Sequence, residues 1–230
     1  MTTTRPSQRR RPRTLIGLSA AIAALLVGCV AAPAAAAHRV PAPAFTAHVT
    51  TVSQTNLGRS WHRGCPVNPR GLRLIRMNHW GFDGRIHTGE LVVGKQAVRP
   101  LMYVFGRAFA AHFPIRRMRP MAKYGGSDTA AMNADNTSAF NCRAVTGDPT
   151  RRSQHSFGNA VDINTRENPY VDRYGRVYPA SGAAYLDRRR KAKGMIRTGD
   201  VITTAMHAVG WKWGGRWWAP DYQHFSANGR

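Results

Sequence analysis

The sequence has 230 residues and is strongly basic, with 34 Lys and Arg against 11 Asp and Glu and a formal net charge of +23. This length suffices for one well-buried domain, and the lack of internal repeats excludes a repeat architecture. The charge favours polyanionic surroundings, which are nucleic acid, anionic lipid or a wall rich in phosphate and carboxylate. Because the chain has only eleven carboxylates, few of its residues can serve as an acidic metal ligand or a general base.

Residues 1–37 have the pattern of an export signal. A cluster of arginines precedes an apolar run, Leu15–Val30, and small residues lead to a cleavage point after Ala37. The run is too short for a comfortable membrane span, so we expect a protein that is secreted or works in the cell envelope. Leu26–Cys29 also resembles a lipoprotein box, and its use would anchor the mature protein through a lipid on Cys29.

Export would leave two cysteines, Cys65 and Cys142, in an oxidising compartment. An even pair in such a compartment predicts a disulfide. The bond would join residues 77 positions apart, and its effect on the unfolded chain would stabilise the fold by about 4.5 kcal/mol. The alternative is two free thiols, one of them a metal ligand, but the pair lacks the C-x-x-C spacing of zinc–thiolate sites.

The first part of the exported chain has little pattern. We expect a linker or loosely packed arm over residues 38–63 and a globular domain over residues 64–230. Within this domain, Leu72–Asn78 and Glu90–Val93 are rich in β-formers and predict strands. Trp80–Gly84 (WGFDG) predicts a turn between them.

Two helices and a central strand are predicted further along. Apolar residues recur at intervals of three and four over Lys95–Phe113 and at Asp200–Val209, which indicates core-facing helices. Ile115–Met121 is expected to be a central strand despite its basic residues. Tyr124–Cys142 is long and irregular, as active-site rims often are. Trp211–Trp218 is dense in aromatic residues and is expected to be partly a packed corner and partly a wall of a cleft.

Two motifs carry the chemistry, SQHSFGNAVDIN at residues 153–164 and PDYQHFS near the end of the chain. Strand alternation places Asp162 on the face opposite its β-branched neighbours, and His155 can fold back towards it across a Gly-containing turn. His224 supplies a second imidazole. Two imidazoles, one carboxylate and a fourth position left for water make a catalytic zinc site. Asp221, three residues before His224, can take the proton from that water.

The spacing H-x6-D, followed far downstream by D-x-x-H, resembles the zinc peptidases that trim peptidoglycan stem peptides. These form the D-alanyl-D-alanine carboxypeptidase (VanY-type) and L-alanyl-D-glutamate endopeptidase family, and the likeness is to its secreted bacterial branch. CPVNPRGLRLIRMNHWGFDGRIHTGELVV, DNTSAFNCR, DINTRENPYV and GWKWGG also resemble it, so the resemblance extends from about Cys65 to Ser226. It implies that an arginine upstream of the first histidine stabilises the oxyanion, and Arg143 is our candidate. It also implies that Ser153 bonds to the backbone or to a ligand.

The expected fold is α+β, a single domain whose mostly antiparallel sheet carries the metal on one face and packs helices on the other. The expected function is zinc-dependent hydrolysis of peptidoglycan peptides by a monomer, with Asp221 as general base; manganese or cobalt would fit the same ligands. Asp221–Phe225 is more like the D-Y-x-H-F of the endopeptidases than the E-x-W-H of the D,D-carboxypeptidases.

Two other functions are considered. The first is a catalytically silent module that binds the wall with the same fold, although such a module would be free to lose Asp221. The second is an exported basic protein that binds nucleic acid or anionic lipid. The positive charge is scattered without a recognition motif, so we expect the anionic cell wall, and no nucleic acid, as partner.

Overall fold

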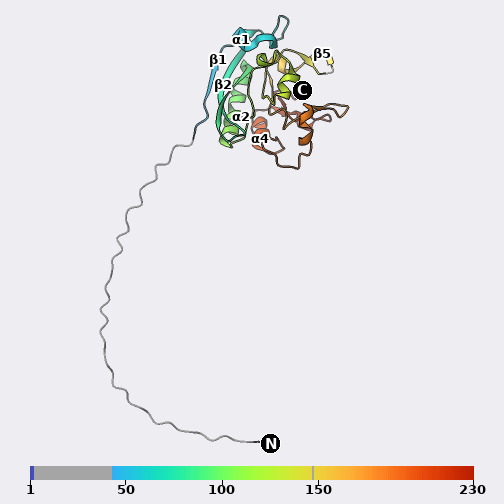
Figure 1. The fold of residues 1–230 in the computed structure, drawn as a ribbon. Helices are drawn as coiled ribbons and strands as arrows, with labels where there is room; N and C mark the ends of the chain where they lie inside the picture. Colours follow the sequence, from blue (N-terminus) through green and yellow to red (C-terminus); the bar gives the residue numbers. More distant parts are fainter. Residues whose placement is uncertain (3–42, 147) are drawn as a thin grey trace, which may run out of the picture. The chain divides into compact units, whose positions relative to one another are not determined.

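The computed structural model describes residues 1–2, 43–146 and 148–230. The predicted export signal, the lipoprotein box and Cys29 therefore lie outside the described residues. Pro43–Arg230 forms one compact unit, which contains both helices and antiparallel sheets (Figure 1), so the predicted α+β class is confirmed. None of the helices in the described part of the chain is long and apolar enough to cross a membrane.

Among the described residues, the β structure consists of two three-stranded antiparallel sheets and two small hairpins. The strands are β1 (Ala47–Thr50), β2 (Leu72–Trp80), β3 (Ile86–Gly94), β4 (Ala144–Val145), β5 (Asp148–Arg152), β6 (Ala160–Asp162), β7 (Tyr170–Val171), β8 (Val177–Tyr178), β9 (Lys212–Trp213) and β10 (His224–Ser226). One sheet has the order β1-β2-β3 and the other the order β6-β10-β9, while β4 pairs with β5 and β7 with β8. The single sheet that we expected is thus divided in two.

In the described part of the chain, four α-helices accompany the sheets: α1 (Gln54–Leu57), α2 (Val98–Ala110), α3 (Asp128–Asn133) and α4 (Val201–Ala208). The third residue of α2 is Pro100, which is tolerated because the first turn of a helix has no internal partner for its N–H groups. Asp200 caps α4, since its Oδ1 accepts a hydrogen bond from the Thr203 N–H at 2.8 Å. Both long predicted helices are therefore present with nearly the expected ends.

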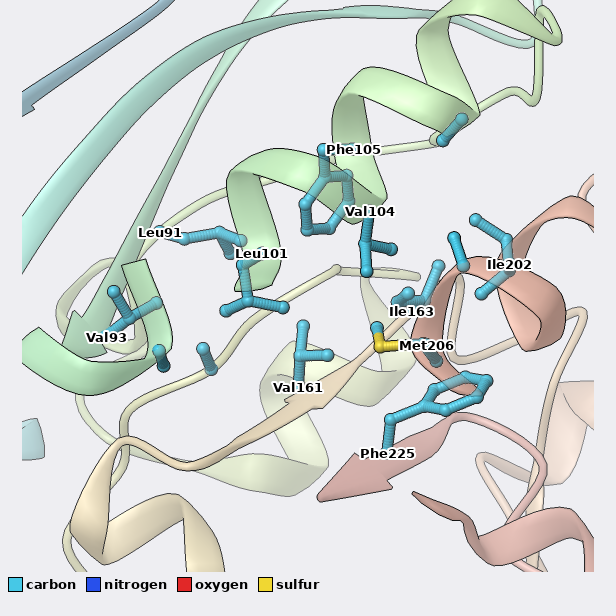
Figure 2. Close-up of a cluster of buried hydrophobic side chains, with 14 of the residues drawn as sticks. Leu91, Val93, Leu101, Val104, Phe105, Val161, Ile163, Ile202, Met206 and Phe225 are labelled. Atoms are coloured by element: carbon cyan, nitrogen blue, oxygen red, sulfur yellow. The ribbon is translucent and has the colours of Figure 1, made fainter. Parts of the chain in front are cut away.

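The main core lies between the two longer helices and the sheet of β6 and β10. Figure 2 shows Val161 and Phe225, which are register partners on these strands, pointing towards the apolar side chains of α2 and α4. Their sequence neighbours, Asp162 and His224, are also register partners. Because side chains alternate along a strand, this second pair lies on the opposite face. The helices thus cover one face of the sheet, and the other is left for polar groups.

The segment Ile115–Met121 is not the central strand that we expected. A proline precedes it and another lies inside it, and proline has no N–H to donate to a neighbouring strand. Side-chain amides satisfy its backbone instead: Arg116 N–H donates to Asn164 Oδ1 at 3.0 Å, and Arg119 N–H donates to Asn136 Oδ1 at 3.1 Å. The segment crosses the molecule with only isolated bridges to its neighbours.

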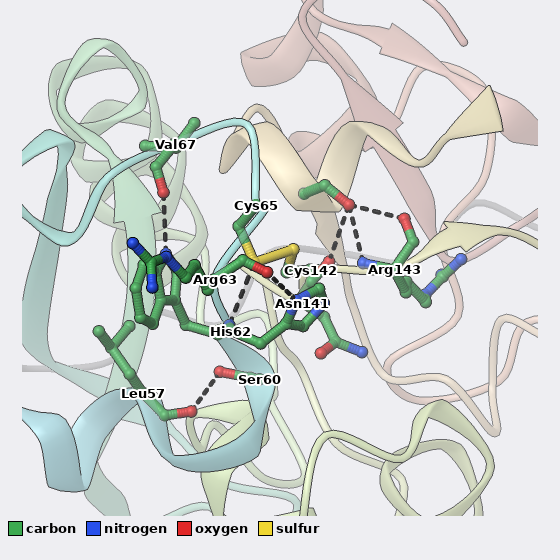
Figure 3. Close-up of a disulfide and its surroundings, with 11 residues drawn as sticks. Leu57, Ser60, His62, Arg63, Cys65, Val67, Asn141, Cys142 and Arg143 are labelled. Carbon is green, nitrogen blue, oxygen red and sulfur yellow. Dashed lines mark hydrogen bonds between the residues drawn. A yellow bond between two sulfur atoms is a disulfide. The ribbon is translucent and has the colours of Figure 1, made fainter.

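The expected arm over residues 38–63 is also corrected, because from Pro43 onward it belongs to the compact unit. β1 pairs with β2 along its whole length, and Leu57 is only 1% exposed, within a second apolar cluster. A disulfide between Cys65 and Cys142, whose Cα atoms are 5.9 Å apart, joins the end of this region to the middle of the chain (Figure 3).

Candidate metal centre

Two imidazoles and a carboxylate converge at the polar face of the second sheet. His155 lies in a short 3₁₀ turn, Gln154–Phe157, while Asp162 ends β6 and His224 begins β10. His155 Nε2 is 3.2 Å from His224 Nδ1 and 3.2 Å from Asp162 Oδ2, and His224 Nδ1 is 3.1 Å from Asp162 Oδ1. The three side chains predicted from the sequence therefore offer one donor atom each to a common point.

The turn that carries His155 is fixed by local chemistry. Ser153 caps it, since its Oγ accepts a hydrogen bond from the His155 N–H at 3.3 Å. Gly158 then turns the chain into β6 with a φ of +67°, which a residue with a side chain rarely adopts. Gly158 also packs directly against the backbone of Gly94, whose N–H donates to the Gly158 carbonyl at 3.0 Å. The position of His155 therefore depends on a glycine at residue 158.

The outer nitrogen of each histidine has a carbonyl partner. His155 Nδ1 lies 2.5 Å from the Ala139 carbonyl oxygen, and His224 Nε2 lies 3.2 Å from the Arg230 backbone oxygen. Carbonyl oxygens only accept hydrogen bonds, so each histidine can donate from its outer nitrogen and turn the lone pair of its inner nitrogen towards the site, which is the tautomer that metal binding needs. This arrangement of outer partners is typical of metal-bound histidines.

Two lone pairs and a carboxylate that face one another repel unless a cation lies between them. Two nitrogens and one oxygen suit Zn²⁺, which in catalytic sites takes three protein ligands and leaves one position open. The residues present therefore fit a zinc ion. A second group in the described chain, His62 with Cys65 and Cys142, also has close donor atoms, but its sulfurs are joined to each other. The predicted alternative of a free thiol as metal ligand is therefore not found.

The carboxylates of the site have perturbed pKa values in opposite directions. Burial alone would raise the pKa of Asp162, but the neighbouring His155 and His224 outweigh it and hold this pKa below the ordinary value. Burial, reinforced by the charge of Asp162, raises the pKa of Asp221 to about 6, against the opposing effect of the histidines. Asp221 Oδ1 is buried and has no hydrogen-bond partner among the described residues. It is thus available to exchange a proton near neutral pH.

A cavity of about 870 Å³ opens beside these groups. Its volume lies in the range of roughly 300–1,000 Å³ that is usual for ligand pockets. Part of its wall comes from α3, which lies within the segment Tyr124–Cys142 predicted as a rim. Another part comes from β5, the strand just before His155. It is lined by every site residue predicted from the sequence, namely Arg143, Ser153, His155, Asp162, Asp221 and His224.

Arg143 is held by groups that the sequence did not reveal. Its guanidinium Nε pairs with Asp128 Oδ2, and Asp128 Oδ1 accepts a hydrogen bond from Asn141 Nδ2 at 2.8 Å. The Arg143 N–H donates to Ser156 Oγ at 2.8 Å, in the same turn as His155. Ser127 caps the short helix α3, and Asp128 is its first residue. This capping pattern predicts a helix start but does not indicate that Asp128 pairs with Arg143, fifteen residues away.

Aromatic and polar side chains that the motifs did not include complete the cavity. Trp217 packs against the His224 ring, with centroids 5.4 Å apart, which supports the expectation that the Trp-rich stretch forms a wall. Trp211 is only 5% exposed and belongs to the core. Tyr170 and Tyr178 stack at 5.9 Å and also line the cavity. The Trp-rich stretch thus contributes both a packed corner and part of the cleft.

Comparison with known proteins gives one match. The family model of the D-alanyl-D-alanine carboxypeptidases matches residues 146–227. This range contains His155, Asp162, Asp221 and His224, whereas Arg143 lies just before it. Neither the curated proteins nor the solved structures that were searched contain a match to the chain.

Proposed function

We propose a specific activity for this chain, whose residues 146–227 match the model of the D-alanyl-D-alanine carboxypeptidases, a family of peptidases that act on cell-wall peptides. The chain is a zinc-dependent peptidase that hydrolyses peptide bonds in peptidoglycan stem peptides. The observation that carries the proposal is the convergence of two imidazole nitrogens and a carboxylate on a cavity that Asp221, with its unpartnered Oδ1, also lines.

His155, Asp162 and His224 would hold the zinc ion. When bound, Zn²⁺ supplies Lewis acidity and lowers the pKa of a water molecule towards about 7. Asp221 takes a proton from the attacking water, for which its inward oxygen without a partner is suited. Burial, which raises the pKa of Asp221, favours return of the proton from the same carboxyl to the departing amine, so that Asp221 acts first as base and then as acid.

Arg143 supplies positive charge on the wall of the same cavity. Negative charge develops on the carbonyl oxygen of the scissile bond, and a cation that is already positioned stabilises it without reorganisation. The pairing with Asp128, which is itself tied to Asn141, fixes the guanidinium in place. Asp128 is thus a positioning residue for Arg143.

We propose a stem peptide as substrate and the L-alanyl-D-glutamate bond as the scissile bond. Arg151 and Arg152 of β5 line the cavity, and guanidinium groups suit the free carboxylates that such peptides carry. The residues Asp221–Phe225, D-Y-x-H-F, favour the endopeptidase type. The protein would act as a monomer outside the cytoplasm, as a secreted or lipid-anchored enzyme of the cell envelope.

Three variants test the roles of the site residues. Asp221→Asn should keep zinc and lose about 10²–10⁴-fold in kcat, the usual effect of a general base. His224→Ala should lose both zinc and turnover. The control Asp187→Asn, which changes a carboxylate outside the cavity, should alter neither. Metal content by mass spectrometry and digestion of stem peptides give the two measurements. Loss of zinc in Asp221→Asn would instead make Asp221 a ligand.

Wild-type digests separate the remaining alternatives. Mass spectrometry should find L-alanine released from the rest of the stem peptide. Loss of terminal D-alanine alone would mean a carboxypeptidase. A wild-type protein that binds wall fragments but neither holds zinc nor cleaves them would support the catalytically silent wall-binding module.

A further inference from the structure

A second cavity, of about 520 Å³, lies next to the loop that carries Asp221. We call it the arginine cavity, because Arg188, Arg197 and Arg216 line it together with Trp213 and Tyr222. These five residues do not line the cavity at the candidate metal centre. The proposed peptidase mechanism gives them no role, so their assembly needs a separate explanation.

The arginine cavity has an excess of positive charge. Its carboxylate, Asp200, is already engaged, since it accepts hydrogen bonds from Thr203 N–H at 2.8 Å and Arg197 N–H at 2.7 Å. Arg197 is half-buried and Arg216 is exposed, and within the described chain their guanidinium groups form no hydrogen bond or ion pair with the protein. Three guanidinium groups that line one cavity repel one another, and a bound anion would remove this repulsion.

Arg188 forms the rigid part of the cavity. Its two terminal nitrogens donate to Asn168 Oδ1 and to backbone carbonyls, among them that of Glu167 at 2.8 Å. Its guanidinium carbon lies 4.4 Å from the centre of the Tyr222 ring. Its Nε is buried and has no hydrogen-bond partner in the described structure. Arg188 is therefore a fixed positive charge in the wall of the cavity, beside the two unpaired arginines.

The aromatic side chains give the cavity an ordered surface. Trp213 Nε1 donates to the Tyr222 carbonyl oxygen at 2.9 Å, and the two rings lie 6.1 Å apart at 51°. A lone inorganic anion would leave this surface and much of the volume unused. The anion should therefore carry an organic group that packs on these rings.

We propose that the arginine cavity binds a phosphate ester, with the phosphate on Arg197 and Arg216 and the organic group against Trp213 and Tyr222. A carboxylate is satisfied by one bidentate guanidinium, whereas a phosphate has enough oxygens to engage two. The proposal does not depend on the peptidase activity. The arginine cavity nevertheless adjoins the loop of the candidate metal centre, because Tyr222 directly follows Asp221. The Asp221 N–H in turn donates to the Gly214 carbonyl at 3.0 Å. An occupied cavity would brace this loop.

Calorimetric titration of the full chain with glycerol 3-phosphate tests the proposal. We expect saturable binding that weakens with salt, and an affinity at least about tenfold lower in Arg197→Gln/Arg216→Gln. The control Arg99→Gln/Arg107→Gln removes the same charge from exposed positions on α2 and should change the affinity less than about twofold. Thermal melting of each variant verifies that it is folded.

The outcomes separate the possible ligands and can overturn the proposal. Equal loss of affinity in both double variants, or no saturable binding in the wild type, would refute it. Inorganic phosphate that binds as tightly as glycerol 3-phosphate would refute the role of the aromatic rings. An oligomer of glycerol phosphate that binds more tightly per phosphate would assign the site to a phosphodiester polymer, and equal binding would assign it to a small ester; both results support the site.

Discussion

Replacement of Glu167 by glutamine should change how stability depends on pH. The Glu167 side chain is only 1% exposed, with the carboxyl of Asp135 beside it and Arg116 Nη2 3.9 Å away. Burial, together with the neighbouring Asp135, raises the pKa of Glu167 to about 8, although Arg116 opposes the change. The folded protein therefore holds a proton on Glu167 that the unfolded chain releases at a much lower pH.

The magnitude follows from the two pKa values. The gap between 4.5, the ordinary value, and about 8 in the folded state corresponds to about 5 kcal/mol. Because the folded state binds this proton more tightly, its contribution to stability is complete below pH 4.5 and is lost as the pH rises to about 8. Glutamine mimics the neutral acid, so Glu167→Gln should match the wild type at pH 4 and exceed it in stability near pH 9.

Urea unfolding of both proteins at several pH values provides the measurement. The difference in the free energy of unfolding, variant minus wild type, should grow by about 1.4 kcal/mol per pH unit between the two pKa values. Groups that do not interact with residue 167 cancel in this difference. Glu90→Gln, at the other glutamate of the chain, is the control for the removal of one carboxylate. Parallel stability curves for Glu167→Gln and the wild type would refute the reasoning.

Two further predictions concern the supports of the site. Cys65→Ala/Cys142→Ala should lower the free energy of unfolding in urea by about 4.5 kcal/mol, and a loss below about 1 kcal/mol would show that packing alone holds the N-terminal region. Gly158→Ala should cost more than about 1 kcal/mol and also weaken zinc affinity, because its Cβ would meet the Gly94 backbone. Gly175→Ala is the matched control, with a similar φ of +77° and open space around the Cβ; equal effects of the two changes on zinc affinity would contradict this reasoning.

The features that could be predicted from the sequence are those determined by neighbouring residues, such as strand alternation, apolar spacing and helix capping. Strand alternation alone indicated that Asp162 faces away from Val161 and Ile163, and these two side chains are fully buried in the core. The spacing of apolar residues located α2, and the cap at Asp200 located α4. These local features could therefore be predicted from neighbouring residues, whereas the meeting of His155 with His224, 69 residues apart, was expected from the two motifs and their resemblance to the peptidase family.

The parts that could not be predicted depend on contacts between distant residues. Along Ile115–Met121, the backbone N–H groups of Arg116 and Arg119 donate to the side chains of Asn164 and Asn136, and no local pattern shows which amide a distant asparagine will bond. The same holds for Asp128 and Arg143, and for the pairing of β1 with β2. The arginine cavity also could not be predicted from the sequence, because its arginines come from separate segments.

The direct pairing of Asp162 with His224 across β6 and β10 makes metal binding sensitive to the alignment of these strands. A slip of one residue would turn His224 towards the helices and bring Phe225 to the polar side. A chain folded in that way could not gather the three donor atoms. The amount of zinc held after refolding therefore counts the molecules whose two strands have found their native alignment, even when no substrate is present.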